Sequence, residues 1–400
     1  MTETLPILQI PAEEHKARAS RLAEFARRQD WTGVVLFDRD YILYYTGFAF
    51  IPTERPMAFL LDAQGKASLF VPRLEREHAA SQPAVDLVEE YPEYPDRPHP
   101  MERLAALMGA MGVRGRVGAD EDGYPWQFGY RGPRLSELTG ATITPIRAFV
   151  EDQMAVKSEA ELRCIRESVR WATLAHTLLQ QYTVVGARET EVSQRASSEA
   201  TRAMLDAIGP AYRAQSATED GPSAGYRGQI GRQAAIPHSL TSNLTFQPGD
   251  VLVTGAGAPV WGYLSELERT MFVGPPGDSA RRMFEHMLAL QDTALRVLRP
   301  GVACAQVDRA VRAYFEDHQL MECWRHHSGH AIGIRYHEGP FLDSGDDTQI
   351  RPGMVFTVEP GLYRTGLGGF RHSDTVVITE DGTEILTAYP RDLESLTLPV

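Results

Sequence analysis

The second half of the chain carries apolar residues at helical spacing. From residue 162 onward they recur every three or four positions, which predicts a helix with one buried face. They are Leu162, Ile165, Val169 and Ala172. The four residues before this run, 158–161, read Ser-Glu-Ala-Glu. A serine followed three positions later by a glutamate is a capping box, so we expect the helix to begin directly after this serine.

Three further segments have the same helical periodicity, with short apolar runs between and after them. We expect these helices at about 188–207, 279–298 and 303–318. The apolar runs are short enough to be strands. They lie at 251–258, 262–272, 354–363 and 370–379. Long helices interleaved with antiparallel strands predict an α+β domain.

The first 150 residues have a different pattern, in which helices and strands are shorter. Helices are expected at 12–29 and 103–112, and strands at 33–37, 40–48 and 57–62. This alternation predicts a smaller α/β domain over 1–150. The α+β domain would then cover 151–400.

Composition narrows the classes of partner. The chain has 400 residues, is 43% hydrophobic, and carries a formal net charge of −13. Nucleic acids and anionic membranes both attract concentrated Lys and Arg, so we expect neither as a partner. No apolar run approaches the roughly 18 residues of a membrane span. The first residues have no basic segment followed by an apolar one, so we expect no signal peptide.

The cysteines indicate a reducing compartment. Cys164, Cys304 and Cys323 are odd in number and widely spaced, and no CxxC pair is present. We therefore expect unpaired, mostly buried thiols in a cytoplasmic protein, without a structural zinc site.

Two glutamates raise the first question of chemistry. Glu266 and Glu268 stand two positions apart in the apolar run 262–272. Side chains alternate along a strand, so both carboxylates would point to one face. Like charges on one face repel unless water, a cation or a ligand separates them. A solvated edge of the sheet would also accommodate the pair.

Other ionisable residues gather in the same half of the chain. His326, His327, His330 and His337 lie within twelve residues, which packing alone does not explain. Glu359 ends the run 354–358, and a carboxylate there needs a partner if it is buried. Carboxylates and imidazoles brought together serve either metal ligation or acid–base catalysis. His238 follows a proline in a turn. It is either part of such a site or simply a surface residue.

The motifs, in their order, resemble the pita-bread family. They are PH with His238, GYxSxxxRT from 262, HHSGHxIGxxxHE from 326, GMVFTVEPGLY from 353 and GFRHSD from 369. The family holds aminopeptidase P, prolidase, methionine aminopeptidase and creatinase. The resemblance covers about 151–400 and implies a pita-bread catalytic domain. The start of the chain resembles the family's N-terminal domain, and the resemblance implies a homodimer.

The ligand set of the family's metallopeptidases carries over only in part. Those enzymes hold two metal ions with two Asp, one His and two Glu. The histidine matches His330 and the first Glu matches Glu359. The second Asp falls on Glu266, whereas Gly255 and Ser373 stand where the first Asp and the last Glu would be. Both losses affect groups that hold the second metal ion, so the resemblance implies a degenerate site.

Creatinase shares a different part of the sequence. Residues 267–270 read Leu-Glu-Arg-Thr, as in creatinase, where this glutamate and one matching Glu359 hold a guanidinium. His238 matches the histidine that acts as general acid and base. Ser373 departs from the creatinase pattern too, and creatine itself is therefore not supported. Arg55 and Arg371 are candidates for holding a substrate carboxylate.

These matches lead to one hypothesis for the site. We expect a hydrolase of C–N bonds that acts without a metal or other cofactor on a small cationic or peptide-like substrate. The expected catalytic residues are His238, Glu268, Glu359 and His337. The expected substrate-binding residues are His330, His326, Arg371 and Arg55.

Two alternatives remain open. Glu266, His330 and Glu359 supply three ligands, enough for one manganese, cobalt or zinc ion in an Xaa-Pro dipeptidase or aminopeptidase. The fold could also serve as a binding module without catalysis.

Overall fold

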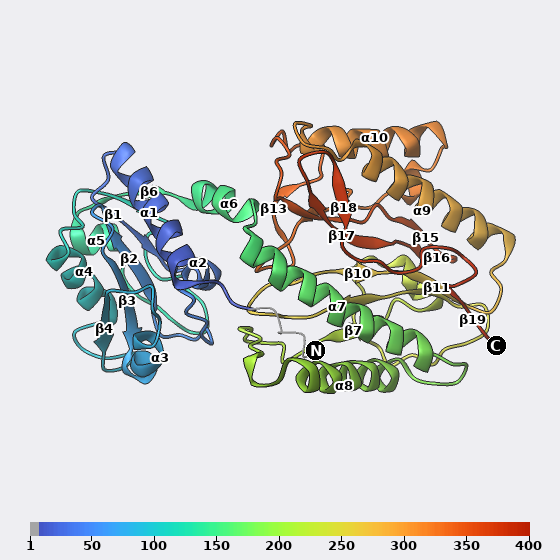
Figure 1. The fold of residues 1–400 in the computed structure, drawn as a ribbon, viewed down its shortest axis with the longest axis horizontal. Coiled ribbons are helices and arrows are strands. Elements are labelled where there is room, and N and C mark those ends of the chain that lie inside the picture. Colours follow the sequence, from blue (N-terminus) through green and yellow to red (C-terminus); the bar gives the residue numbers. More distant parts are fainter. Residues whose placement is uncertain (1–7) are drawn as a thin grey trace, which may run out of the picture. The chain divides into compact units, whose positions relative to one another are not determined.

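The computed structural model describes residues 8–400, which form two units (Figure 1). The N-terminal unit comprises Gln9–Met154 together with Gln215–Ala217. The C-terminal unit comprises Ala155–Ala214 and Thr218–Val400, together with Leu8.

The N-terminal unit is built on one mixed sheet with the strand order β4-β3-β2-β1-β5-β6. The strands are β1 (Gly33–Leu36), β2 (Ala58–Asp62), β3 (Ala67–Pro72), β4 (Leu87–Tyr91), β5 (Arg116–Ala119) and β6 (Thr142–Pro145). The helices are α1 (Ala12–Arg28), α2 (Arg39–Thr46), α3 (Arg76–Ala80), α4 (Pro100–Ala110), α5 (Leu135–Thr139) and α6 (Arg147–Ala155). The expected α/β character of this part is confirmed.

The strand expected at 40–48 is wrong, because the segment forms helix α2. Tyrosine and isoleucine favour strands, but local capping outweighs that preference here. The Asp38 side chain accepts hydrogen bonds from the amides of Asp40 and Tyr41 at the start of the helix. Gly47 ends it with a left-handed backbone, φ 79°, which suits glycine.

The C-terminal unit has four long helices, as expected. They are α7 (Glu159–Tyr182), α8 (Glu189–Ile208), α9 (Asp278–Val297) and α10 (Cys304–Asp317). Ser158 caps α7 in a capping box with Glu161, which confirms that prediction. Helix α7 packs against α8 and the strands β7, β9 and β10, whereas α9 packs against α10 and the later strands β14 and β16 (Figure 1).

Between the helix pairs lies an eight-stranded sheet with the order β13-β12-β14-β17-β10-β9-β7, to which β18 adds beside β17. Its strands are β7 (Ser223–Gly225), β9 (Gly255–Gly257), β10 (Leu267–Glu268), β12 (His330–Ala331), β13 (Glu338–Phe341), β14 (Val355–Val358), β17 (Ser373–Ile378) and β18 (Thr383–Ile385). Smaller sheets contain β8 (Val251–Val253), β11 (Thr270–Val273) and β19 (Thr397–Leu398), and β15 (Leu362–Arg364) with β16 (Gly368–Phe370). The expected strand at 262–272 is thus two strands, which belong to different sheets.

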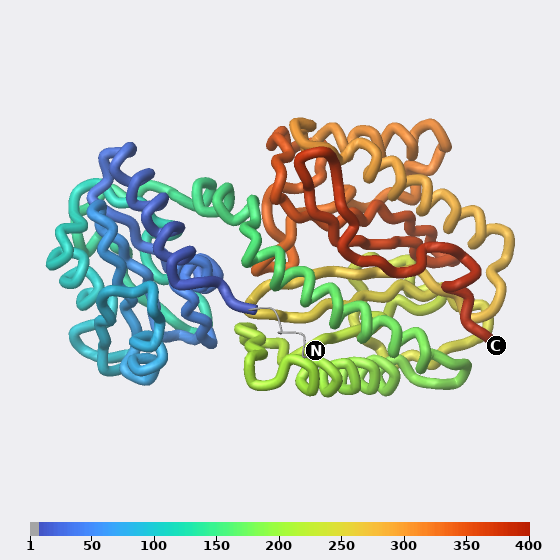
Figure 2. Tube along the Cα trace, in the orientation of Figure 1, coloured from blue at the N-terminus to red at the C-terminus, as the bar shows by residue number. Residues whose placement is uncertain are grey.

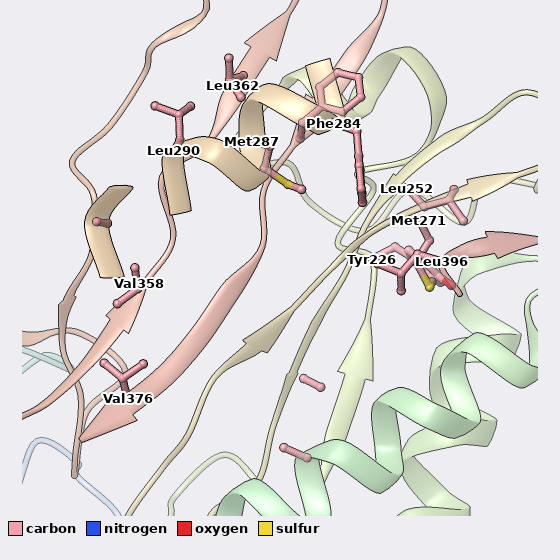
Figure 3. Close-up of a cluster of buried hydrophobic side chains, with 14 of the residues drawn as sticks. Tyr226, Leu252, Met271, Phe284, Met287, Leu290, Val358, Leu362, Val376 and Leu396 are labelled. Carbon is pink, nitrogen blue, oxygen red and sulfur yellow. The ribbon is translucent and has the colours of Figure 1, made fainter. Parts of the chain in front are cut away.

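One layer of the core of this unit lies between α9 and the strands. Phe284, Met287 and Leu290 of α9 belong to one hydrophobic cluster with Val358 and Val376 of the sheet, and Figure 3 labels all five side chains. All five side chains are buried. Burial of one such side chain contributes about 1.5–3 kcal/mol, so this layer fixes the strands that carry the polar residues described below.

Two further observations concern the chain as a whole. Cys164, Cys304 and Cys323 are buried, and no disulfide joins them, as expected. Within residues 8–400, no helix has the length and apolar character needed to cross a membrane.

Candidate active site

The strand register brings residues from distant segments into one row. Glu268 on β10 lies opposite Ser373 on β17, and Val358 on β14 lies opposite Asp374. Continuing the second register by one residue places Glu359 beside Ser373. Residues directly opposite one another in antiparallel strands point to the same face. Figure 2 shows the late red segment of β17 beside the yellow segment of β10.

Gly255 belongs to the same row. Leu267 pairs with Ala256, and extending this register by one residue puts Gly255 opposite Glu268. A Cβ atom added to Gly255 would lie 3.5 Å from Glu268 Oε1. Gly255 and Ser373 are the two residues that stand in place of metal ligands of the family's metallopeptidases. They therefore flank Glu268 on the two neighbouring strands.

Glu359 is buried, as the run before it predicted, and it has cationic partners. Its Oε1 lies 3.3 Å from His330 Nε2, and its Oε2 lies 3.7 Å from Arg371 Nε. Burial alone would raise the pKa of Glu359. The adjacent His330 and Arg371 outweigh that effect and hold its pKa below the usual value.

His330 is fully buried at the start of β12. Its Nδ1 lies 3.0 Å from the carbonyl oxygen of Ala331, which directs Nε2 toward the carboxylates. Nε2 has no well-aligned hydrogen-bond partner among the described residues, although Glu359 is within ion-pair distance. Burial lowers the pKa of His330, but Glu359 and Glu266 outweigh it and raise the value to about 9.

Glu266 shares a face with Glu268, because both side chains line the same pocket. Ser373 donates a hydrogen bond from Oγ to Glu266 Oε1 over 2.7 Å. Burial, followed by the charges of Glu359 and Glu268, raises the pKa of Glu266 to about 7. The carboxylate therefore lies in a field that favours a proton or another cation.

Glu266, His330 and Glu359 together could hold a metal ion. Each offers one ligand atom, and the three atoms lie within 4.8 Å of one another. The neighbouring carboxylates raise the pKa values of Glu266 and His330, so the cluster favours added positive charge, and among the described residues the buried His330 Nε2 has no aligned hydrogen-bond partner. One imidazole and two carboxylates form a donor set that suits a divalent ion.

Glu268 has protein cations on both sides. Arg371 donates to both of its carboxylate oxygens, from Nε and, over 2.7 Å, from Nη2. Arg227 donates from Nη2 to Oε1, also over 2.7 Å. An external cation would thus compete with two guanidinium groups for this carboxylate. Whether Glu268 takes part in catalysis stays a prediction.

His326 belongs to the same network. Its Nε2 lies 2.9 Å from Tyr363 Oη, and Tyr363 Oη accepts a hydrogen bond from Arg371 over 3.0 Å. Burial lowers the pKa of His326. This chain of contacts fixes Arg371 behind the carboxylates, so His326 holds another residue in place within this structure. Its predicted contact with substrate remains untested.

A pocket of about 530 Å³ opens in front of the row. Its walls include Glu266, Glu268, Arg227 and His337. His337 stacks on His330 with ring centroids 3.8 Å apart. Burial and the charge of His330 lower the pKa of His337 to about 4, which keeps its ring neutral near pH 7. His238 is exposed and close enough for its charge to affect His337.

Arg55 lies in the N-terminal unit. It forms ion pairs there with Glu54 and Glu93, over 2.6 and 2.7 Å. Its predicted contribution to a substrate site stays a prediction.

Three residues of the site were not identified from the sequence. Arg227 and Ser193 line the pocket, and Tyr363 positions Arg371. Tyr363 lies four residues after Glu359 in the motif GMVFTVEPGLY. A polar hydroxyl so close in sequence to that carboxylate could have indicated a role in the site. Arg227 and Ser193 stand in ordinary polar contexts, and only the fold places them near the glutamates.

The fold and this cluster define the chain as a pita-bread hydrolase. Residues 163–380 match the model of metallopeptidase family M24, and residues 18–153 match the creatinase/prolidase N-terminal domain. The chain belongs to metallopeptidase family M24.

Curated relatives are peptidases by name. The Xaa-Pro dipeptidase of Pyrococcus horikoshii is 31% identical over 244 residues, which are 61% of this chain and 66% of that protein. The alignment thus spans slightly less than two thirds of that relative. The probable dipeptidase PepE of Mycobacterium bovis is 30% identical over 246 residues, or 61% of each chain.

Solved structures match over nearly the whole chain. Dipeptidase PepE from Mycobacterium ulcerans superimposes with a TM-score of 0.81 at 25% identity, covering 98% of this chain and 100% of that one. The prolidase from Pyrococcus horikoshii has a TM-score of 0.79 at 24% identity, covering 94% and 99%. These structures confirm the predicted fold.

The expectation of a site without metal or cofactor is wrong. It rested on the replaced ligands Gly255 and Ser373, but the chain belongs to a family of metallopeptidases. Three of the five ligand positions still carry donor groups, and the structure brings them together.

Proposed function

We propose that this protein is a metallopeptidase that uses one divalent ion to hydrolyse short peptides, with Xaa-Pro dipeptides as the first candidates. The observation that carries the proposal is the cluster of Glu266, His330 and Glu359, whose ligand atoms lie within 4.8 Å of one another. The names of the relatives support the substrate class.

The number of ions follows from the residues beside the cluster. Gly255 offers no side-chain donor, and Ser373 donates its hydroxyl to Glu266. The guanidinium groups of Arg227 and Arg371 already neutralise Glu268. A second divalent ion would lie close to two fixed positive charges and lack anionic ligands, so one ion is expected.

The residues of the chain would divide the remaining work. A divalent ion at such a site supplies Lewis acidity, which polarises an amide carbonyl and makes water more acidic. His337 lines the pocket and presents a ring that can form a hydrogen bond with a bound peptide. The exposed His238 lies near it and could exchange a proton with solvent. Tyr363 and His326 hold Arg371, which keeps Glu359 ionised.

Elemental mass spectrometry on the protein as purified, and after exposure to manganese, cobalt or zinc, tests the metal site. We expect about one ion per chain, lost in His330→Ala and Glu359→Gln. Glu219→Gln is a matched control, since this carboxylate accepts a hydrogen bond from Tyr336 near the pocket but lies outside the cluster. Absence of any bound ion in the wild type would refute the proposal.

Hydrolysis of Ala-Pro and related dipeptides by the metal-loaded protein tests the reaction. We expect chelator-sensitive release of proline. A protein that binds one ion and peptides without cleaving any of them would instead be a binding module. The homodimer and the cytoplasmic location stay predictions, and sedimentation analysis of the purified protein measures the first.

A further inference from the structure

Arg227 is a fixed cation in the wall of the pocket. Its Nη2 donates to Glu268, and its side chain is 49% exposed. Glu268 is the only hydrogen-bonding partner of this guanidinium within residues 8–400. Since a guanidinium carries five N–H donors, several remain available on the pocket side. No other Lys or Arg lines this pocket in the described part of the chain.

The backbone of Arg227 indicates that its placement costs free energy. Its φ angle is 51°, in the left-handed region that residues with a side chain rarely adopt. A long side chain in this conformation persists where the surroundings enforce it, and such positions cluster at ligand sites. The following residue, Gly228, also has a positive φ of 73°. The side chain of Arg227 therefore extends from a tight turn.

Arg227 shares its carboxylate partner with a second arginine. Arg227 and Arg371 both pair with the carboxylate of Glu268, and Arg371 pairs with Glu359 as well. Gly255 lies beside this ion pair, and a Cβ atom added to it would lie 3.7 Å from Arg227 Nη2, so the missing side chain leaves room next to the guanidinium. A cationic ligand would compete with two guanidinium groups for Glu268, whereas an anionic oxygen could accept hydrogen bonds from the donors of Arg227 that Glu268 leaves free.

A second group in the same pocket also lacks a partner. Ser193 Oγ is buried and has no hydrogen bond within the described residues. Buried hydroxyl groups are normally satisfied, so an unpaired one in a pocket wall is a donor available to a ligand. Ser193 lies beside Gly225, two residues before Arg227.

We infer that Arg227 is the anion-binding residue of the pocket and binds a negatively charged oxygen of the substrate. The inference rests on the proposed peptidase function. The oxygen belongs either to a free carboxylate of the bound peptide or to the carbonyl as negative charge develops on it during hydrolysis. Both sources need the same fixed, bidentate donor.

Calorimetric binding of proline and prolinamide to the metal-loaded protein tests the first source without any turnover. The two molecules differ in the carboxylate, and we expect proline to bind at least about tenfold more tightly. The ratio should fall to near one in Arg227→Gln and be partly kept in Arg227→Lys. Arg232→Gln removes an equal charge from an exposed position outside the pocket and should leave the ratio unchanged.

Hydrolysis of Ala-Pro and of its C-terminal amide tests the second source. If Arg227 binds the developing oxyanion, Arg227→Gln lowers kcat by at least about tenfold for both peptides, and KM changes little. If it binds the carboxylate, only the KM for Ala-Pro rises. An unchanged binding ratio together with unchanged kcat in Arg227→Gln would overturn the inference. Absence of hydrolysis with a preserved preference for proline would refute the peptidase function alone.

Discussion

His176 on α7 offers a quantitative test of the electrostatics inside the C-terminal unit. The side chain is fully buried, and Nε2 lies 2.7 Å from Thr254 Oγ1. That hydroxyl donates to the carbonyl of Arg269, so Nε2 is the donor to Thr254, and Nδ1 is an acceptor with no partner among residues 8–400. Burial, together with the charge of Arg269, lowers the pKa of His176 to about 3.

The sign and size of the effect follow from linkage. In the unfolded chain His176 takes up a proton near its ordinary pKa of 6.5, whereas in the folded chain it does so only near 3. Its contribution to stability is therefore complete above pH 6.5 and is lost progressively as the pH falls toward 3. Between pH 7 and pH 5 these two values correspond to a loss of about 2 kcal/mol in the free energy of unfolding.

Urea unfolding at pH 7 and pH 5 measures this contribution. His176→Gln keeps an N–H donor for Thr254 and cannot titrate, so its free energy of unfolding should fall by about 2 kcal/mol less than that of the wild type. His318→Gln changes an exposed histidine of the same unit and serves as the control. An identical pH dependence in wild type and His176→Gln would refute the reasoning.

Three further predictions concern stability and the metal. Lys157→Met removes one partner of the buried ion pair with Glu338, 2.9 Å long, and should cost about 3 kcal/mol in urea unfolding. Arg166→Gln breaks an exposed ion pair and should lower the free energy of unfolding by less than about 1 kcal/mol. Equal losses in Lys157→Met and Arg166→Gln would contradict this account. Ser158→Ala should lower the free energy of unfolding by about 1 kcal/mol, whereas no change would exclude a role for the cap. Added manganese should raise the melting temperature of the wild type but not of Glu359→Gln, as scanning calorimetry can check.

The sequence predicted the long helices well because their signals are local. The apolar spacing from residue 162 and the cap at Ser158 both act within a few turns. It failed at 40–48, where tyrosine and isoleucine favour strands but Asp38 and Gly47 delimit a helix. Capping residues on both sides of a short segment therefore outweighed side-chain preference.

The site was predictable in its residue types but not in its electrostatics. Glu266, His330 and Glu359 were identified as one alternative set of ligands, and the structure places them together. The hypothesis that Glu268 awaits a cationic ligand could not anticipate Arg227 and Arg371. A turn after β7 brings Arg227 to Glu268, and the register of β10 with β17 brings Arg371 there. Neither the turn nor the register produces a periodic pattern in the sequence.

The row of residues across β9, β10, β17 and β14 also bears on how the protein reaches its working state. Its members come from segments far apart in the chain, so the ion site exists only after several long-range strand pairs have formed. Such contacts are closed late and slowly during folding. Metal binding should therefore occur only once the sheet is complete. In a refolding experiment, we expect the signal of the bound ion to appear more slowly than the signal of helix formation.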